Sequence, residues 1–163
     1  MGFTHAAPIL FESVSNVTAT LGANSPELGT RINKGGNEWT FVYNAGTSDI
    51  APRLGCIVSA VSGYSVTVSS VTQASKLFGV CVNATLTTGT YGWIQTGGFV
   101  DIKNGMASTA LAGADIVELG ADGDFVHAPI AATAVGNHTF ACAYIMAATG
   151  SAGTAGAFLS GNK

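Results

Sequence analysis

The sequence contains few charged residues. Only 9% of its 163 residues are Asp, Glu, Lys or Arg, against about 25% in an average soluble domain. The six basic residues are scattered and form no stripe that could follow a phosphate backbone, which argues against nucleic-acid binding. Disorder is also disfavoured, because disordered chains are rich in charge and poor in apolar residues, whereas 47% of this chain is hydrophobic.

Long apolar runs are missing as well. A membrane-spanning helix needs about 20 predominantly apolar residues in a row, and every apolar run here is soon interrupted by Gly, Ser, Thr or Asn. The first residues, MGFTHAAPILFESV, have neither the basic segment nor the apolar core of a secretory signal peptide. We therefore expect cytoplasmic synthesis and no membrane partner.

Cysteine and histidine occur three times each, without the spacing of a metal site. The cysteines are Cys56, Cys81 and Cys142. Each cysteine lies in an apolar run, where a free thiol acts as a small hydrophobic group, so we expect buried, reduced thiols. The histidines show no HxH or HExxH pattern. The sequence therefore predicts no disulfide framework, metal or cofactor.

Catalytic motifs are absent too. The glycines of ATGSAGTAGAF match neither a dinucleotide fingerprint nor a P-loop, and no GxSxG nucleophile elbow occurs. The acidic stretch GADIVELGADGDF fails the EF-hand pattern, which leaves a weak cation site at Asp122 and Asp124 as an alternative to a simple turn. We expect no catalytic residues and no enzymatic activity.

The chain does contain short apolar runs that alternate with turn residues. In EWTFVYNA, Trp39, Phe41 and Tyr43 recur with a period of two, as on one face of a strand. Similar runs follow at intervals of about 8–12 residues, which is typical of a sandwich or barrel. The fold class we expect is all-β: a single β-sandwich or β-barrel-like domain.

Two glycine-containing segments carry turn signals. ADG separates DIVELG from DFVHAP and predicts a β-hairpin. Gly97 and Gly98 separate YGWIQT from GFVDIK and indicate either a tight turn or a bulge.

Residues 1–35 differ from the rest. They are rich in Asn, Ser, Thr, Gly and Pro, which predicts an extended N-terminal arm ahead of a β-rich domain at 36–163. Such an arm can add a strand to the sheet edge of a neighbouring subunit. Its candidate apolar anchors are Phe3, Ile9, Leu10 and Phe11. Packing of these side chains on their own domain is an equally open alternative.

The segment KLFGVCVNATLTTGTYGWIQTGGFVDIK, followed by GADIVELGADGDFV, resembles capsid decoration (cement) proteins of tailed bacteriophages. In that family a G-Y-G-W-[IV]-Q type strand, a glycine and an apolar strand precede a G-x-x-[LV]…G-x-[FV] hairpin. The matching positions are Gly89, Tyr91, Gly92, Trp93, Ile94, Gln95, Gly97, Gly98, Gly113, Leu119 and Gly123. The resemblance runs from about Pro52 to the C-terminus and leaves the arm outside.

The resemblance implies a structural virion protein, made in the host cytoplasm and placed on the outer surface of an icosahedral capsid. It would bridge neighbouring major capsid protein subunits and stabilise the shell, often as a homotrimer. Trp39, Tyr91 and Trp93 are candidates for core or subunit contacts, because aromatic anchors often carry interface energy. An alternative hypothesis is a carbohydrate-binding or adhesive β-sandwich module of a phage fibre or spike.

Overall fold

The computed structural model describes residues 17–22, 25–59, 63–68, 77–106, 110–113, 116–127, 143–147 and 153–159. These residues form ten strands and one short 3₁₀ turn, which confirms the all-β prediction. The strands are β1 (Arg31–Lys34), β2 (Asn37–Asn44), β3 (Gly55–Val58), β4 (Ser65–Val68), β5 (Leu77–Val80), β6 (Tyr91–Lys103), β7 (Ile116–Leu119), β8 (Phe125–His127), β9 (Ala143–Ala147) and β10 (Thr154–Leu159). Within the described part of the chain, no helix is long and apolar enough to cross a membrane.

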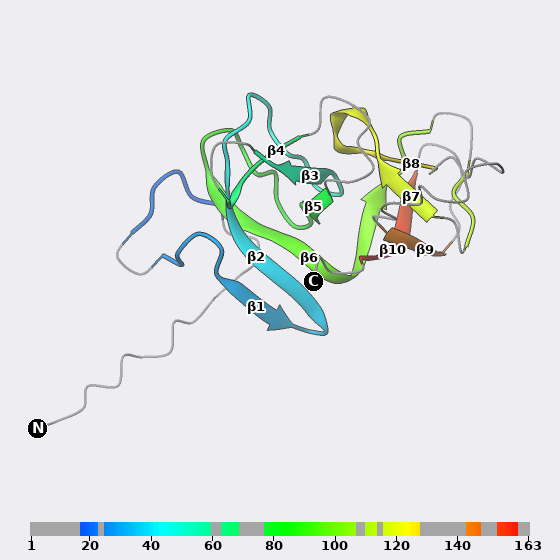
Figure 1. Ribbon diagram of the computed structural model, residues 1–163, viewed down its shortest axis with the longest axis horizontal. Coiled ribbons are helices and arrows are strands. Elements are labelled where there is room, and N and C mark those ends of the chain that lie inside the picture. The colour runs from blue at the N-terminus through cyan, green and yellow to red at the C-terminus, as the bar shows by residue number, and fades with distance from the viewer. Residues whose placement is uncertain are drawn as a thin grey trace, which may run out of the picture.

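Five strands close into a barrel, which we call the barrel throughout. Their order is β2–β4–β3–β5–β6, and β6 pairs again with β2 (Figure 1). The closing ladder places Thr40 opposite Ile94 and Val42 opposite Gly92. Only the β2–β4 pair is parallel; the other neighbours in the barrel are antiparallel. Closure leaves these strands without free edges along the paired stretches.

Strand β6 belongs to two sheets. Its first half pairs with β2, and its second half, from Gly98 to Lys103, pairs with β10. The strand changes partner at Gly97 and Gly98 without turning back, so the tight-turn alternative is wrong. Gly98 has a φ of +91° and no room for a Cβ beside Asn37. Buried Gln95 donates from Nε2 to the carbonyls of Gly97 (3.1 Å) and Phe99 (2.7 Å), which satisfies acceptors near the switch.

The strands that follow form a second, curled sheet, which we call the C-terminal sheet. Its order is β6–β10–β9–β7–β8, and Figure 1 shows these strands beyond the end of β6, on the side away from β1 and β2. A parallel bridge between Asn104 and Phe125 joins the end of β6 to β8, so this sheet curls back towards its first strand. β7 and β8 pair as the hairpin that ADG predicted, with Asp122 and Gly123 at positive φ in the turn.

The fold has two hydrophobic cores, built from side chains that alternate inward, and the C-terminal core also includes Val80 of barrel strand β5. The barrel core contains Val42, Ile50, Cys56, Val66, Cys81, Leu86 and Ile94. The C-terminal core contains Val80, Val100, Ile102, Leu111, Val117, Leu119, Phe125, Ile145, Ala155, Ala157 and Leu159. Both described cysteines are buried and free, as predicted, and burial raises the pKa of each thiol. Cys142 lies outside the described residues.

The described part of the N-terminal region contacts the barrel. Thr18 bridges Tyr91 at the start of β6, and β1 pairs with β2 across a turn in which Gly35 and Gly36 both have positive φ. Positive φ at both central residues is what a type I′ hairpin turn requires. The proposed anchors Phe3, Ile9, Leu10 and Phe11 lie outside the described residues, so the arm itself stays a prediction.

Candidate functional site

The β1–β2 hairpin presents two chemically different faces. Residues on one strand alternate between the faces, and the pairs Arg31–Thr40 and Ile32–Trp39 show which residues share a face. Trp39 and its neighbours contribute to an aromatic cluster on one side. Arg31 and Glu38 line a hollow on the other side. The hairpin therefore connects two candidate sites.

The aromatic cluster consists of Trp39, Phe41 and Trp93, with Tyr91 packed against it. The rings of Phe41 and Trp93 lie 5.2 Å apart at 59°, and those of Phe41 and Tyr91 lie 6.4 Å apart and are stacked. The structure thus brings together the three predicted contact residues Trp39, Tyr91 and Trp93. Trp39 is 6% exposed and Trp93 8%, while Tyr91 is half-buried. A subunit contact through these residues stays a prediction.

The indole N–H of Trp39 is buried and has no hydrogen-bond partner among the described residues. A buried donor without a partner costs about 1–3 kcal/mol. Burial of the Trp39 ring therefore stabilises the fold, and its unsatisfied N–H offsets part of that stabilisation.

The hollow on the opposite face lies at the mouth of the barrel. Near its end, β2 pairs with β4, where Tyr43 lies opposite Ser65. Nearer its start, β2 pairs with β1, where Thr40 lies opposite Arg31. This end of the barrel is lined by β1, β2, β5 and β6. Between them lies a small hollow of about 20 Å³, partly open to solvent and lined by Arg31, Glu38, Phe78 and Thr96.

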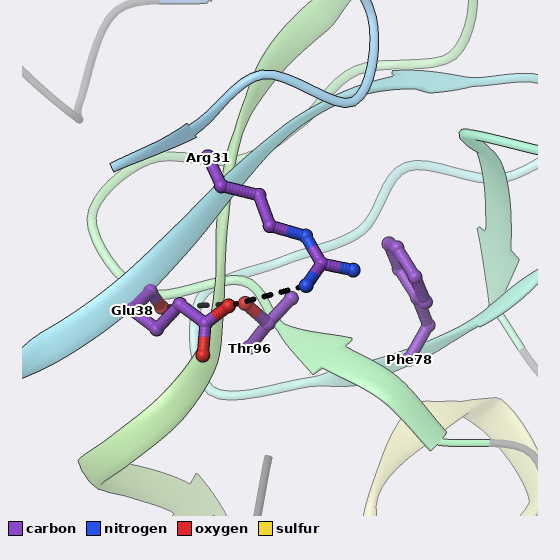
Figure 2. Close-up of a pocket in the computed structure, with 4 residues that line it drawn as sticks. All are labelled: Arg31, Glu38, Phe78 and Thr96. Carbon is purple, nitrogen blue, oxygen red and sulfur yellow. Dashed lines mark hydrogen bonds and ion pairs between the residues drawn. The ribbon is translucent and has the colours of Figure 1, made fainter. Parts of the chain in front are cut away.

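Polar groups occupy one side of this hollow. Figure 2 shows the Arg31 side chain extending over Glu38 and Thr96, with the Phe78 ring facing them. Arg31 Nη1 lies 3.5 Å from Glu38 Oε1. Thr96 Oγ1 lies 3.1 Å from Thr40 Oγ1 and donates to the backbone carbonyl of Glu38 at 3.5 Å. The side chains of Arg31 and Glu38 are 56% and 35% exposed, so the ion pair adds little stability and is accessible to a ligand.

The ring of Phe78 forms the other wall. Phe78 is half-buried, and its ring centroid lies 6.5 Å from that of exposed Tyr64 at an angle of 59°. Tyr64 lies directly over Gly29, where any Cβ would collide with the phenol ring. The mouth of the barrel thus combines a charge-balanced polar wall with an aromatic wall.

A second exposed feature lies on the outward face of the C-terminal sheet. Phe99 of β6 and Phe158 of β10 are cross-strand partners, and they are 52% and 46% exposed. Sequence reasoning missed both residues. Phe99 could have been found from the alternation in GFVDIK, which buries Val100 and Ile102 and leaves Phe99 on the opposite face.

The acidic residues considered for a cation site lie at the β7–β8 turn. Burial raises the pKa of the Asp124 carboxyl, the positive charge of Lys103 opposes this, and the charge of Asp122 adds to it. Across the described segments, no three His, Cys, Asp or Glu side chains gather in a way that could hold a metal ion. Two carboxylates alone provide no defined coordination site.

Comparisons with known proteins show a structural relationship but no sequence relationship. No family model matches the sequence, and no curated protein is similar to it in sequence. Among solved structures, the chain is similar to the head fiber gp8.5 N base of bacteriophage phi29, with a TM-score of 0.53 and 11% sequence identity. The match covers 75% of this chain and 94% of that one. This chain therefore shares its fold with the base of a phage head fiber.

Proposed function

We propose that this chain is a structural protein of a phage virion, located on the outer surface of the head. The observation that carries the proposal is the shared fold, because the match spans almost the whole of the head fiber base. The resemblance of the chain from about Pro52 onward to capsid decoration proteins supports the same class. Fold likeness alone does not determine function, so the proposal needs the composition and surface of this chain as well.

Composition and surface support a role in assembly. A chain with only 9% charged residues has a surface prone to association. Phe99 and Phe158 place two adjacent aromatic rings in solvent, and exposed apolar patches mark interaction sites. In our proposal, this face of the C-terminal sheet contacts the major capsid protein and bridges neighbouring subunits of the shell, with the chain acting as a homotrimer and without catalysis.

The direct test is binding to heads of the same phage that lack this protein. We expect saturable, stoichiometric binding of the purified chain, measured by co-sedimentation, and a trimeric mass in solution. Phe99→Ser and Phe158→Ser should each weaken binding about tenfold, as the loss of an interface anchor does. The matched control is Val58→Ser, which removes a similarly exposed apolar side chain from β3. Absence of binding by the unaltered chain, together with a monomeric mass, would refute the proposal.

A second experiment tests the predicted arm. Deleting residues 1–12 should weaken assembly while leaving the unfolding midpoint unchanged, because the β-rich domain begins later in the chain. If the deletion lowers the unfolding midpoint and leaves assembly intact, the arm is part of the core instead.

A further inference from the structure

We propose that the outer edge of β1 binds residues 9–12 of the N-terminal arm of a second copy of this chain, as an added antiparallel strand. β1 stands at one end of the strand order, and within the described residues it pairs only with β2 (Figure 1). The inference rests on the proposed function, because it supplies the contact between copies of the homotrimer. Each copy gives its arm to one neighbour and accepts an arm from the other, and such a head-to-tail contact can close a ring.

The backbone groups of β1 alternate between its two edges. In an antiparallel ladder every second residue exchanges hydrogen bonds with its partner, and the residues between them point their N–H and C=O groups the other way. Phe41 donates its N–H to the carbonyl of Thr30 (2.9 Å), so Ile32, two residues on, also faces β2. The backbone groups of Arg31 and Asn33 therefore point outward. An extended segment can bind to such an edge through its own backbone.

The charges of the hairpin select the strand that binds. Arg31 and Lys34 of β1 are basic, and the hairpin carries one acid, Glu38, 3.5 Å from Arg31. Pairing two β1 strands would gather four basic side chains at one seam, which is unfavourable. A strand with one acid and otherwise apolar residues balances the hairpin instead. Glu12 is the only acid among the first 26 residues, which contain no Lys or Arg, and it follows the apolar run ILF.

One register satisfies both faces of the added strand. It places Glu12 opposite Arg31, where the carboxylate and the guanidinium carry opposite charges. Phe11 then falls opposite Ile32, because antiparallel positions advance together. Ile32 is half-buried and packs against the aromatic cluster, so Phe11 extends that cluster over the edge of the sheet.

The neighbouring registers fit less well. A shift by one residue in either direction moves Glu12 to the face of Ile32, next to the aromatic cluster. A shift by two residues in one direction places Pro8 opposite Asn33, where the edge needs an N–H donor that proline lacks. In the other direction the same shift leaves Ile32 opposite Ser13, and the apolar contact is lost.

The path of the chain favours the arm of a second copy over the arm of the same chain. Thr18 and Tyr91 exchange hydrogen bonds on one edge of β6, whereas Tyr43 of β2 lies on its other edge. Four strand spacings, about 19 Å in total, separate Thr18 from a strand added outside β1, and Arg31 lies about 10 Å further along. The six residues back to Glu12 span at most about 20–22 Å. The same arm would be fully extended the whole way, with no residue left to turn into the ladder.

The first test is a cross-link between copies in solution. The full chain carries Phe11→Cys and Ile32→Cys, with Cys142→Ser to remove a thiol, and is oxidised with copper phenanthroline. Opposed residues at a non-hydrogen-bonded position have Cα atoms about 4.5 Å apart, which suits a disulfide. We expect covalent dimers and trimers on a non-reducing gel. The control pairs Phe11→Cys with Asn33→Cys, on the opposite face, and should give almost no cross-link.

Three results of this experiment would overturn the proposal: no disulfide, a disulfide within one chain, or equal yield from the control pair. A second measurement does not depend on engineered thiols. Glu12→Lys should raise the Kd of self-association about fivefold or more, because repulsion replaces attraction beside Arg31, and Glu12→Gln should raise it less. An unchanged Kd in Glu12→Lys would also overturn the proposal.

The cross-link needs no phage heads, so this proposal and the proposed function fail separately. Cross-linked copies that do not bind heads would support the arm exchange and count against the virion role. Head binding by a trimer that forms no cross-link would support the virion role and overturn the arm exchange.

Discussion

Asn44 offers the sharpest test of how the barrel is held together. It lies at the end of β2, and its side chain is fully buried. Nδ2 donates to the carbonyls of Ser48 (3.0 Å) and Leu86 (2.9 Å), and Oδ1 accepts from the N–H of Gly46 (3.0 Å). One amide therefore ties the end of β2 to the loop that follows it and to the segment before β6.

Replacing Asn44 by Ala removes three hydrogen bonds at once. Each contributes about 1 kcal/mol net, so we expect the free energy of unfolding to fall by about 3 kcal/mol. This is a large part of the roughly 5–15 kcal/mol that is typical of a folded domain. The measurement is equilibrium unfolding in urea, followed by tryptophan fluorescence. Asn33→Ala, at an exposed position of β1, is the control and should change stability by less than about 0.5 kcal/mol.

Asn44→Asp separates hydrogen bonding from side-chain volume. The shape is retained, but a carboxylate cannot donate to the two carbonyls and would be a buried charge. The pKa of this carboxyl should rise in the folded state above its unfolded value of about 3.9. Between these two values the folded state binds more protons, so the stability of the variant should fall as pH rises and recover on acidification. A loss below about 1 kcal/mol in Asn44→Ala, or an Asp variant insensitive to pH, would refute the reasoning.

Three further predictions concern positions elsewhere in the fold. Gly98→Ala should destabilise the chain by about 2 kcal/mol or more in thermal unfolding, because Gly98 has positive φ and a Cβ would collide with Asn37. The control is Gly113→Ala, whose added Cβ meets open space and should leave stability nearly unchanged. Equal effects of the two substitutions would contradict the argument. Trp39→Phe should change the free energy of unfolding by less than about 1 kcal/mol, because the lost ring area is offset by removal of an unsatisfied donor. A loss of stability as large as that caused by Trp39→Ala would show that the indole N–H is hydrogen-bonded. Burial raises the pKa of Asp124, so its ionised form disfavours the folded state; stability relative to Asp124→Asn should therefore be lower at neutral pH than near about pH 4, and urea unfolding at both values checks the sign.

Local signals predicted the local structure well. The alternation of Trp39 and Phe41 did place both rings on one face, and ADG did form the β7–β8 turn. The apolar neighbours of Cys56 and Cys81 correctly indicated buried thiols. In each of these cases, the residues that determine the outcome are neighbours in the sequence.

The same signals could not predict the pairing of strands that are distant in the sequence. Gly97 and Gly98 look locally like a turn, but β10 pairs with the residues that follow and keeps the strand extended. Strand β1 lies within residues 1–35, which were assigned to the arm because they are rich in Asn, Ser, Thr, Gly and Pro. It forms because the Gly35–Gly36 turn folds it onto β2, and its polarity suits an edge strand.

The candidate sites show the same limit. Arg31 and Glu38 could be recognised as hairpin neighbours, but Thr96 reaches the hollow from a position 56 residues beyond its bonding partner Thr40. Phe99 becomes a cross-strand neighbour of Phe158 only through the β6–β10 ladder. Sites of this kind depend on sheet topology, which turn and period signals do not encode.

The double membership of β6 also sets an order of events during synthesis. The barrel cannot close while the ribosome has yet to release residues 91–97, because β2, made long before, has no other partner along that edge. The C-terminal sheet in turn has no first strand until the rest of β6 has emerged. Both halves of the fold therefore depend on this one segment, and the C-terminal sheet depends also on β10, which is made later still.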